Sequence, residues 1–357
     1  MRWIAGVAGV VLLAVVLWDA FETIILPRRV SGRIRLTKVF YRSTWAPWRA
    51  TARLLTGRRR DAFLSFYGPL SLLLLLALWA VGIVLAFGML QWAAGSALTG
   101  GALGFGTDVY MSGTSFFTLG LGDVAPRSAI AKTLTVVESG TGFAFLAAVI
   151  GYFPVIYQAF SRREVAISLL DARAGSPPSA TELLWRHRSD PGAAALVELL
   201  RDWERWAADV LESHLSYPPL GYFRSQHYNE SWVAALATIL DTSAVVIVGF
   251  EGGCVRQAEL TFAMARHAVV DLSQVYSTPP RRSDERLPSA QLARLRERLA
   301  QLRRMYEPYV EALSDHLALP LPPWVRERER PDNWQTSAWD RVVQLPQRAP
   351  AVEDDHF

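Results

Sequence analysis

The sequence predicts an all-α membrane protein with three transmembrane helices and a short re-entrant helix, followed by a helical water-soluble domain. Of its 357 residues, 51% are hydrophobic and 20% are charged, a balance that suits a membrane protein with a sizeable part outside the bilayer. Three stretches are apolar over the roughly 20 residues that a spanning helix needs. They are residues 3–26, a part of 62–107, and residues 134–160.

The first apolar stretch is expected to be a retained N-terminal transmembrane helix, residues 1–27. An arginine precedes it, as in a signal peptide, but it ends in ETIILPRRV with no small-residue cleavage pattern. Asp19 and Glu22 interrupt it and share one helix face. Salt bridges to Arg28, Arg29 or other basic residues are one interpretation of these acids, and proton or ion sensing is the other.

The distribution of arginine predicts the orientation of the chain. Residues 28–60 hold eleven basic residues and no acid, whereas residues 91–106 hold no charge. The positive-inside rule therefore places the N-terminus outside and makes residues 28–61 a basic cytoplasmic loop. Arg162 and Arg163 mark the inner end of the third span, where we expect them to meet the anionic inner leaflet.

A fourth apolar stretch, residues 233–250, competes as a span. Asp241 lies at its centre, which opposes insertion by roughly 3 kcal/mol. Arginines flank the stretch on both sides, so spanning would export one of the two sets. The sequence therefore predicts a buried helix of the soluble domain.

The connection between the second and third spans contains the stretch TLGLGD, residues 118–123. A helix capped by Thr107 or Asp108 precedes it and is too short to cross the bilayer. The chain is expected to enter as this half-helix and to return as extended backbone, which is tolerated only around a cavity or inside protein. The glycines permit unusual dihedral angles, so that successive carbonyls can face one axis and form a cation site.

This order of elements resembles the pore of the prokaryotic potassium channel family, whose filter has the form T-V-G-Y-G-D. The resemblance covers residues 62–162 and adds a helix in front. It implies an outer helix at 63–91, a pore helix at 108–117, a filter at 118–123 and an inner helix at 129–161. It also implies a multi-pass protein of the cell (inner) membrane. The filter residues are Thr118, Leu119, Gly120, Leu121, Gly122 and Asp123.

Two filter positions depart from the family pattern, because Leu119 replaces the usual valine and Leu121 the usual tyrosine. The Gly-Leu-Gly pattern is similar to the second pore repeat of some two-pore-domain potassium channels. Since one chain carries one filter, the resemblance implies a homotetramer. Its backbone carbonyls would hold K⁺ as the permeant ion, and no cofactor is expected.

The third span contains candidate gating residues. Gly142 lies near mid-helix, where the inner helix of related channels often bends, and Gly140 is the substitute. Pro154 is expected to kink the helix near its cytoplasmic end. The alternative is that the glycines serve only close helix packing.

Three residues are candidates for supporting the filter: Glu138, Thr114 and Tyr110. Some potassium channels brace the filter aspartate with a glutamate of the pore helix, and the matching position here is Thr114. Glu138, near the outer end of the third span, could act instead as a buried acceptor behind the filter. The alternative is a carboxylate that reaches the outer interface.

Residues 163–320 are predicted to form a helical cytoplasmic domain, and residues 321–357 a largely disordered tail. Residues 289–317 carry an a/d heptad pattern interrupted by Pro308, which fits either a coiled coil or a helix packed within its own domain. The domain has no glycine-rich nucleotide motif after a strand and no regular metal-ligand spacing, and Cys254 is the one cysteine. These observations favour a protein that is not an enzyme.

The leading hypothesis is a homotetrameric potassium-selective or potassium-preferring channel, gated by its inner helix under the influence of the cytoplasmic domain. Its expected partners are identical copies and a bilayer with anionic inner-leaflet lipids. One alternative is a non-conducting, channel-like membrane protein for signalling or scaffolding. The other is a poorly selective cation channel.

Overall fold

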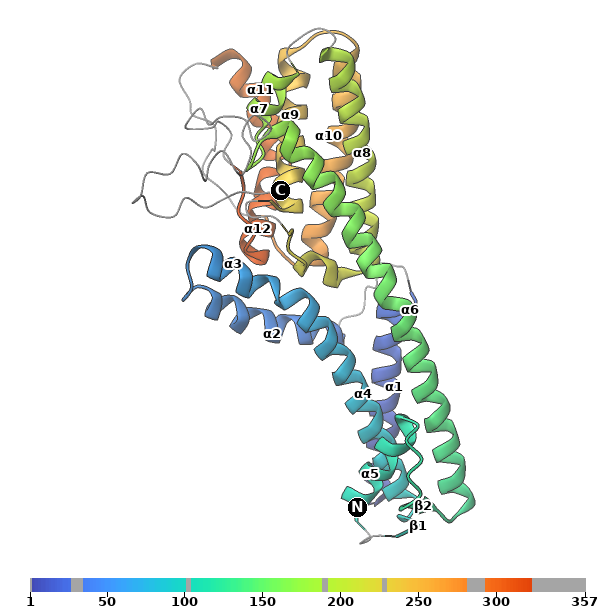
Figure 1. Cartoon of the computed structure of the whole chain (residues 1–357). Coiled ribbons are helices and arrows are strands. Elements are labelled where there is room, and N and C mark those ends of the chain that lie inside the picture. Colours follow the sequence, from blue (N-terminus) through green and yellow to red (C-terminus); the bar gives the residue numbers. More distant parts are fainter. Residues whose placement is uncertain are drawn as a thin grey trace, which may run out of the picture. The chain divides into compact units, whose positions relative to one another are not determined.

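The computed structural model describes residues 2–26, 35–100, 104–187, 192–226, 230–280 and 293–322. It is an all-α membrane protein with a helical C-terminal region (Figure 1). The chain divides into two compact units. The membrane unit comprises Met1–Leu54 and Phe66–Gln158, and the C-terminal unit comprises Leu55–Ser65 and Ala159–Phe357.

The membrane unit contains α1 (Arg2–Ile24), α2 (Leu36–Ala52), α4 (Tyr67–Ala93), α5 (Phe105–Phe116) and the first part of α6 (Ala129–Ala174). Its two short strands, β1 (Leu98–Thr99) and β2 (Ala125–Pro126), pair antiparallel. Helices α1, α4 and α6 are long and apolar enough to cross a membrane. These helices lie where the sequence predicted spans at 1–27, 63–91 and 129–161, but α6 continues to Ala174.

Helices α1 and α4 pack closely through small residues. A Cβ atom added to Gly9 would lie 2.9 Å from the Ala86 carbonyl oxygen, and one added to Gly82 would lie 2.9 Å from a methyl of Val16. Glycine lets two helix backbones approach in this way, which is a common device in membranes. The extra N-terminal helix is therefore an integral part of the membrane unit.

The region 28–61, expected as a loop, is largely helical, since α2 and α3 (Gly57–Ser65) lie within or overlap it. Thr37, Tyr41 and Trp45 of α2 recur every four residues and are buried. The rings of Tyr41 and Trp45 pack against Tyr67 at the start of α4, with ring centroids 6.4 and 4.7 Å apart. The polar residues between Tyr41 and Trp45, Arg42 among them, obscured this period of four in the sequence.

Among the described residues, Asp19 has neutral hydrogen-bond donors as its partners. Its carboxylate is buried and accepts hydrogen bonds from the Thr37 hydroxyl at 2.6 Å, the Thr37 backbone N–H at 3.1 Å and the Trp79 indole at 2.9 Å. Glu22 does form an ion pair, with Arg35 at 3.3 Å. Arg28 and Arg29 lie outside the described residues.

The C-terminal unit contains α3, the end of α6, α7 (Ala180–Arg186), α8 (Gly192–Ser216), the 3-10 turn η1 (Pro218–Tyr222), α9 (Trp232–Gly249), α10 (Gly253–Val275), α11 (Ala293–Arg304) and α12 (Glu307–Leu317). Helix α9 is the apolar stretch that competed as a fourth span. Its length and composition would allow a crossing, but 78% of it is buried inside the structure. The Tyr306 hydroxyl donates a hydrogen bond to Asp241 at its centre. The prediction of a buried helix is confirmed.

The predicted single helix at 289–317 is wrong, because α11 and α12 are separate helices that break at Met305–Tyr306. Pro308 stands in the first turn of α12, where its missing N–H does no harm. Tyr306, Val310 and Leu313 are buried, and α12 contacts α9 and α10. The a/d heptad pattern of residues 289–317 therefore reflects packing of α12 inside the C-terminal unit and not a coiled coil. Residues 289–292, and the predicted tail from residue 323 onward, lie outside the described residues.

Candidate functional site

The TLGLGD stretch follows the C-terminal end of α5 and has an alternating backbone. Thr118, Gly120 and Gly122 have φ angles of +54°, +59° and +77°, whereas φ is not positive at Leu119 and Leu121. A left-handed φ is a genuine outlier for a β-branched residue such as Thr118 and marks a conformation held by its surroundings. Added Cβ atoms at Gly120 and Gly122 would meet nothing within 4 Å, so these glycines are needed for their dihedral angles and not for space.

Backbone hydrogen bonds fix the start of this stretch. The Leu119 N–H donates to the Thr114 carbonyl at 2.8 Å, and the Thr118 N–H donates to the Ser115 carbonyl at 3.1 Å. The Thr114 hydroxyl bonds to the Met111 carbonyl of its own helix. Thr114 thus contacts the TLGLGD stretch through its backbone, and its side chain does not contact Asp123.

Asp123, at the end of the TLGLGD stretch, is contacted by two elements. The Tyr110 hydroxyl of α5 donates to its carboxylate at 2.9 Å. Gly100, just after β1, lies so close that an added Cβ would be 2.0 Å from the Asp123 carbonyl oxygen. Next to it, the Thr99 hydroxyl is 3.1 Å from both the N–H and the carbonyl of Ala125 in β2. The strand pair and Gly100 therefore hold the C-terminal end of the TLGLGD stretch. The sequence did not indicate this contact.

Contacts behind α5 join it to α6. Glu138 is 0% exposed, and the Ser112 hydroxyl donates to its carboxyl group. Gly142 permits a second close approach, since a Cβ there would be 2.0 Å from the Phe116 carbonyl oxygen at the end of α5. A Cβ at Gly140 would meet nothing within 4 Å. Of the two predicted hinge glycines, Gly142 thus has a packing role, and α6 continues as a helix through Pro154.

In the C-terminal unit, Arg163 forms a buried hydrogen-bond centre. Its guanidinium is 3% exposed and donates to the carbonyls of Leu220 at 3.0 Å and Phe223 at 2.7 Å. It also pairs with Glu164 at 2.8 Å. The expectation that Arg163 meets the inner leaflet is therefore wrong, because η1 and the residue after it enclose this side chain. Arg162 is exposed.

His214 of α8 completes this centre. Its Nε2 is 3.2 Å from Arg163 Nη1, and its Nδ1 is 2.8 Å from the Val210 carbonyl oxygen. The neutral ring with its proton on Nδ1 satisfies both contacts. Burial, followed by the positive charge of Arg163, holds the pKa of His214 well below its usual value, and the Val210 bond opposes this shift.

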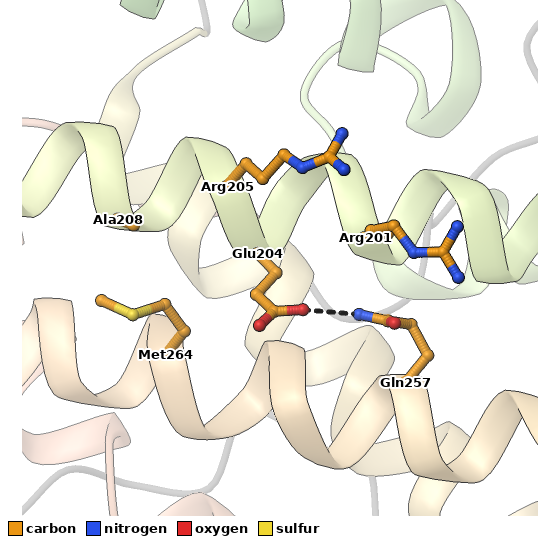
Figure 2. A pocket seen from close by; sticks show the side chains of 6 residues that line it. All are labelled: Arg201, Glu204, Arg205, Ala208, Gln257 and Met264. Carbon is orange, nitrogen blue, oxygen red and sulfur yellow. Dashed lines mark hydrogen bonds between the residues drawn. The ribbon is translucent and has the colours of Figure 1, made fainter.

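A hollow of about 380 Å³ lies between α8 and α10 (Figure 2). The Gln257 amide donates to Glu204 across its floor at 2.7 Å, and the Arg201 and Arg205 side chains lie on the α8 side. In the described part of the chain, no three His, Cys, Asp or Glu side chains come together as metal ligands. The hollow itself points to no particular chemistry.

Comparison with known families identifies the region around TLGLGD. Residues 70–158 match a family model described as "Ion channel". This range runs from α4 through α5 and the TLGLGD stretch into α6. No curated protein and no solved structure matched the chain. The match of residues 70–158 therefore supports an ion channel as the function of the membrane unit.

Proposed function

We propose that the protein is a homotetrameric channel that selects or prefers K⁺, with residues 118–123 as its filter. The alternation of left-handed φ at Thr118, Gly120 and Gly122 carries the proposal. Such an alternation lets successive carbonyls turn toward one axis. Four chains would then surround a K⁺ ion with rings of carbonyl oxygens that replace its water shell. K⁺ is the transported ion, and no cofactor is needed.

Apolar exposure supports assembly with identical copies. The side chains of Leu119 and Leu121 are 60% and 62% exposed in the single chain. Large apolar residues of α6, such as Val136 and Phe143, are exposed as well. A filter that must stay rigid needs neighbours around such side chains, and symmetric copies would supply them.

Contacts at the outer mouth support selectivity despite the leucine at position 121. In the family that this pore resembles, a tyrosine at this position braces the filter through its hydroxyl. Here the Tyr110 hydroxyl and the β1–β2 pair would hold Asp123 instead. A poorly selective channel is the outcome expected if these contacts do not replace that brace.

The continuity of α6 supports control of the channel by the C-terminal unit. The helix runs from the pore region to Ala174, and Arg163 anchors its second part to η1 and α8. We propose that the C-terminal unit lies in the cytoplasm, the N-terminus lies outside, and the gate is on α6. Pro154, which lacks an N–H, and Gly140, which has open space around it, are its candidate hinges.

The decisive experiment measures K⁺ and Na⁺ flux from the purified protein in liposomes. Gly120→Ala and Gly122→Ala should abolish flux, because a side chain disfavours the left-handed φ at both positions. Gly106→Ala is the matched control, because Gly106 lies in α5 with open space around it and no positive φ. Normal flux in both filter variants would contradict the filter assignment. No flux in the unmodified protein would favour the non-conducting scaffold.

Leu121→Tyr sharpens the same experiment. The substitution restores the residue usual in the family, so it should be tolerated and should raise the ratio of K⁺ to Na⁺ flux. A fall in that ratio would indicate that the outer mouth is braced in a way that tyrosine disturbs.

A further inference from the structure

We propose that α2 is a docking site for anionic phospholipid headgroups, bound by Lys38, Arg42, Arg49 and Arg53. The proposal concerns a helix outside the 70–158 family match and assigns it a partner. It uses the proposed topology only in requiring that α2 lie at a bilayer surface.

The position of α2 within the membrane unit places it at the ends of two spans. Its residues pack against the last turns of α1 and the start of α4. The helix runs across α1 and not along it (Figure 1). A helix that lies across the ends of spanning helices is located at the level of the headgroups.

The buried carboxylate of Asp19 fixes this position. It accepts hydrogen bonds from both the backbone N–H and the hydroxyl of Thr37, in the first turn of α2, and from the Trp79 indole of α4. One side chain of α1 therefore joins α2 and α4, and its negative charge lies at the positive end of the α2 dipole. At the start of α4, the Tyr67 hydroxyl lies 2.8 Å from that of Thr44. The hydrogen bonds to Asp19 explain why this carboxylate, which would otherwise oppose membrane insertion, occurs in α1.

The three basic residues of α2 and Arg53, its C-cap, form one stripe. Their spacings of four, seven and four residues bring all four onto one side of a helix. Lys38, Arg42 and Arg53 each follow a buried residue of the face that packs on the spans, so the stripe lies about 100° around the helix from that face. These three side chains are exposed, and Arg49 is half-buried.

Charge complementarity identifies the occupant. No acidic residue occurs in α2 or between residues 35 and 60, and none of the described residues forms an ion pair with Lys38, Arg42 or Arg53. Lys38, Arg42 and Arg53, three cations without an acidic partner among the described residues, lie beside the ends of spanning helices and match the phosphates of anionic lipids. Each such charge contributes about a fivefold change in affinity. The headgroup contact expected at Arg163 is thus reassigned to α2.

The test is native mass spectrometry of the full-length protein in detergent, titrated with phosphatidylglycerol or phosphatidylcholine of the same acyl chains. The unmodified protein should retain phosphatidylglycerol preferentially. The triple variant Lys38→Gln, Arg42→Gln, Arg53→Gln should lose affinity for it by about a hundredfold, or fall to the level of phosphatidylcholine. Equal retention of phosphatidylglycerol by this variant would overturn the proposal.

Two further variants control for charge and folding. The first removes three exposed arginines of α8 and α10 (Arg201→Gln, Arg205→Gln, Arg256→Gln) and should bind phosphatidylglycerol normally; a matching loss would show that net charge alone is measured. The second is Arg42→Gln alone, whose affinity for phosphatidylglycerol should fall about fivefold. It provides the test if the triple variant misfolds. Ion flux is not the readout, so the result is independent of whether the filter conducts.

Discussion

Helix α6 carries a buried carboxyl group, that of Glu138, and a buried guanidinium group, that of Arg163, and the two units satisfy them differently. In the membrane unit, Glu138 receives one hydrogen bond, from Ser112, and its second carboxyl oxygen has no partner among the described residues. In the C-terminal unit, Arg163 bonds to two carbonyls, an imidazole and a carboxylate. The comparison indicates that Arg163 holds several elements together, whereas Glu138 makes one local contact.

The largest expected effect is that of Arg163→Met. The substitution leaves the carbonyls of Leu220 and Phe223 and the His214 imidazole buried without their donor, at about 1–3 kcal/mol for each unpaired group. We expect the free energy of unfolding of the C-terminal unit to fall by about 3 kcal/mol or more. Urea-induced loss of near-ultraviolet circular dichroism in the full-length protein measures it, with exposed Arg162→Met as the control. Equal effects of the two variants would remove the distinction between Arg163 and an ordinary surface arginine.

Gly142→Ala tests the packing of α6 one turn beyond Glu138. Because its Cβ would lie 2.0 Å from the Phe116 carbonyl oxygen, the helices must separate, at about 1–3 kcal/mol. We expect a lower melting temperature and altered flux. Gly140→Ala, with open space around the Cβ, should leave the melting temperature unchanged. If Gly142→Ala preserves the melting temperature and changes only gating, the hinge interpretation replaces the packing one.

Acidification tests the His214 side of the Arg163 centre. The folded protein holds the pKa of His214 well below 6.5, so the unfolded chain binds the proton more readily. The contribution of His214 to stability is therefore complete above about pH 6.5 and is lost as the pH falls toward the folded pKa, by at most about 1.4 kcal/mol per pH unit. Urea unfolding at pH 7.5 and 5.5 should show a smaller loss in His214→Gln than in the unmodified protein. The same loss in both proteins would assign the acid sensitivity to other groups.

The smallest expected effect is that of Glu138→Gln. A glutamine has the same shape and can still accept the Ser112 hydrogen bond, so the melting temperature should shift by the equivalent of less than about 1 kcal/mol. Glu138→Leu keeps the volume but removes the acceptor, and it should cost more. A large effect of the glutamine variant would mean that the carboxyl group has a partner that a single chain does not contain, and the contrast with Arg163 would then disappear.

Local patterns in the sequence predicted part of this structure well. The all-α fold follows from the apolar stretches, and the burial of α9 follows from Asp241 and the flanking arginines. The spacing of Gly120 and Gly122 located the stretch in which left-handed φ angles occur. These inferences succeed because hydropathy and glycine conformation depend on residues close together in the chain.

Features that depend on distant residues could not be predicted. Arg163 follows an apolar stretch of the sequence, so its context indicates a membrane edge, but the carbonyls that accept its hydrogen bonds lie 57 and 60 residues away. The pair β1–β2 involves two residues on each side and has no recognisable pattern of alternation. Likewise, the described partners of Asp19 are Thr37 and Trp79, which lie 18 and 60 residues away in the chain.

Thr118 has a consequence for protein engineering. Its left-handed φ, on a β-branched residue, costs about 1–3 kcal/mol in each chain. A redesign that optimised the stability of one chain alone would choose glycine or asparagine at this position. It would thereby delete a hydroxyl from the proposed filter while improving every measure of folding. Stability-guided redesign of this protein should therefore leave position 118 unchanged and begin at residues outside the match to the ion-channel model.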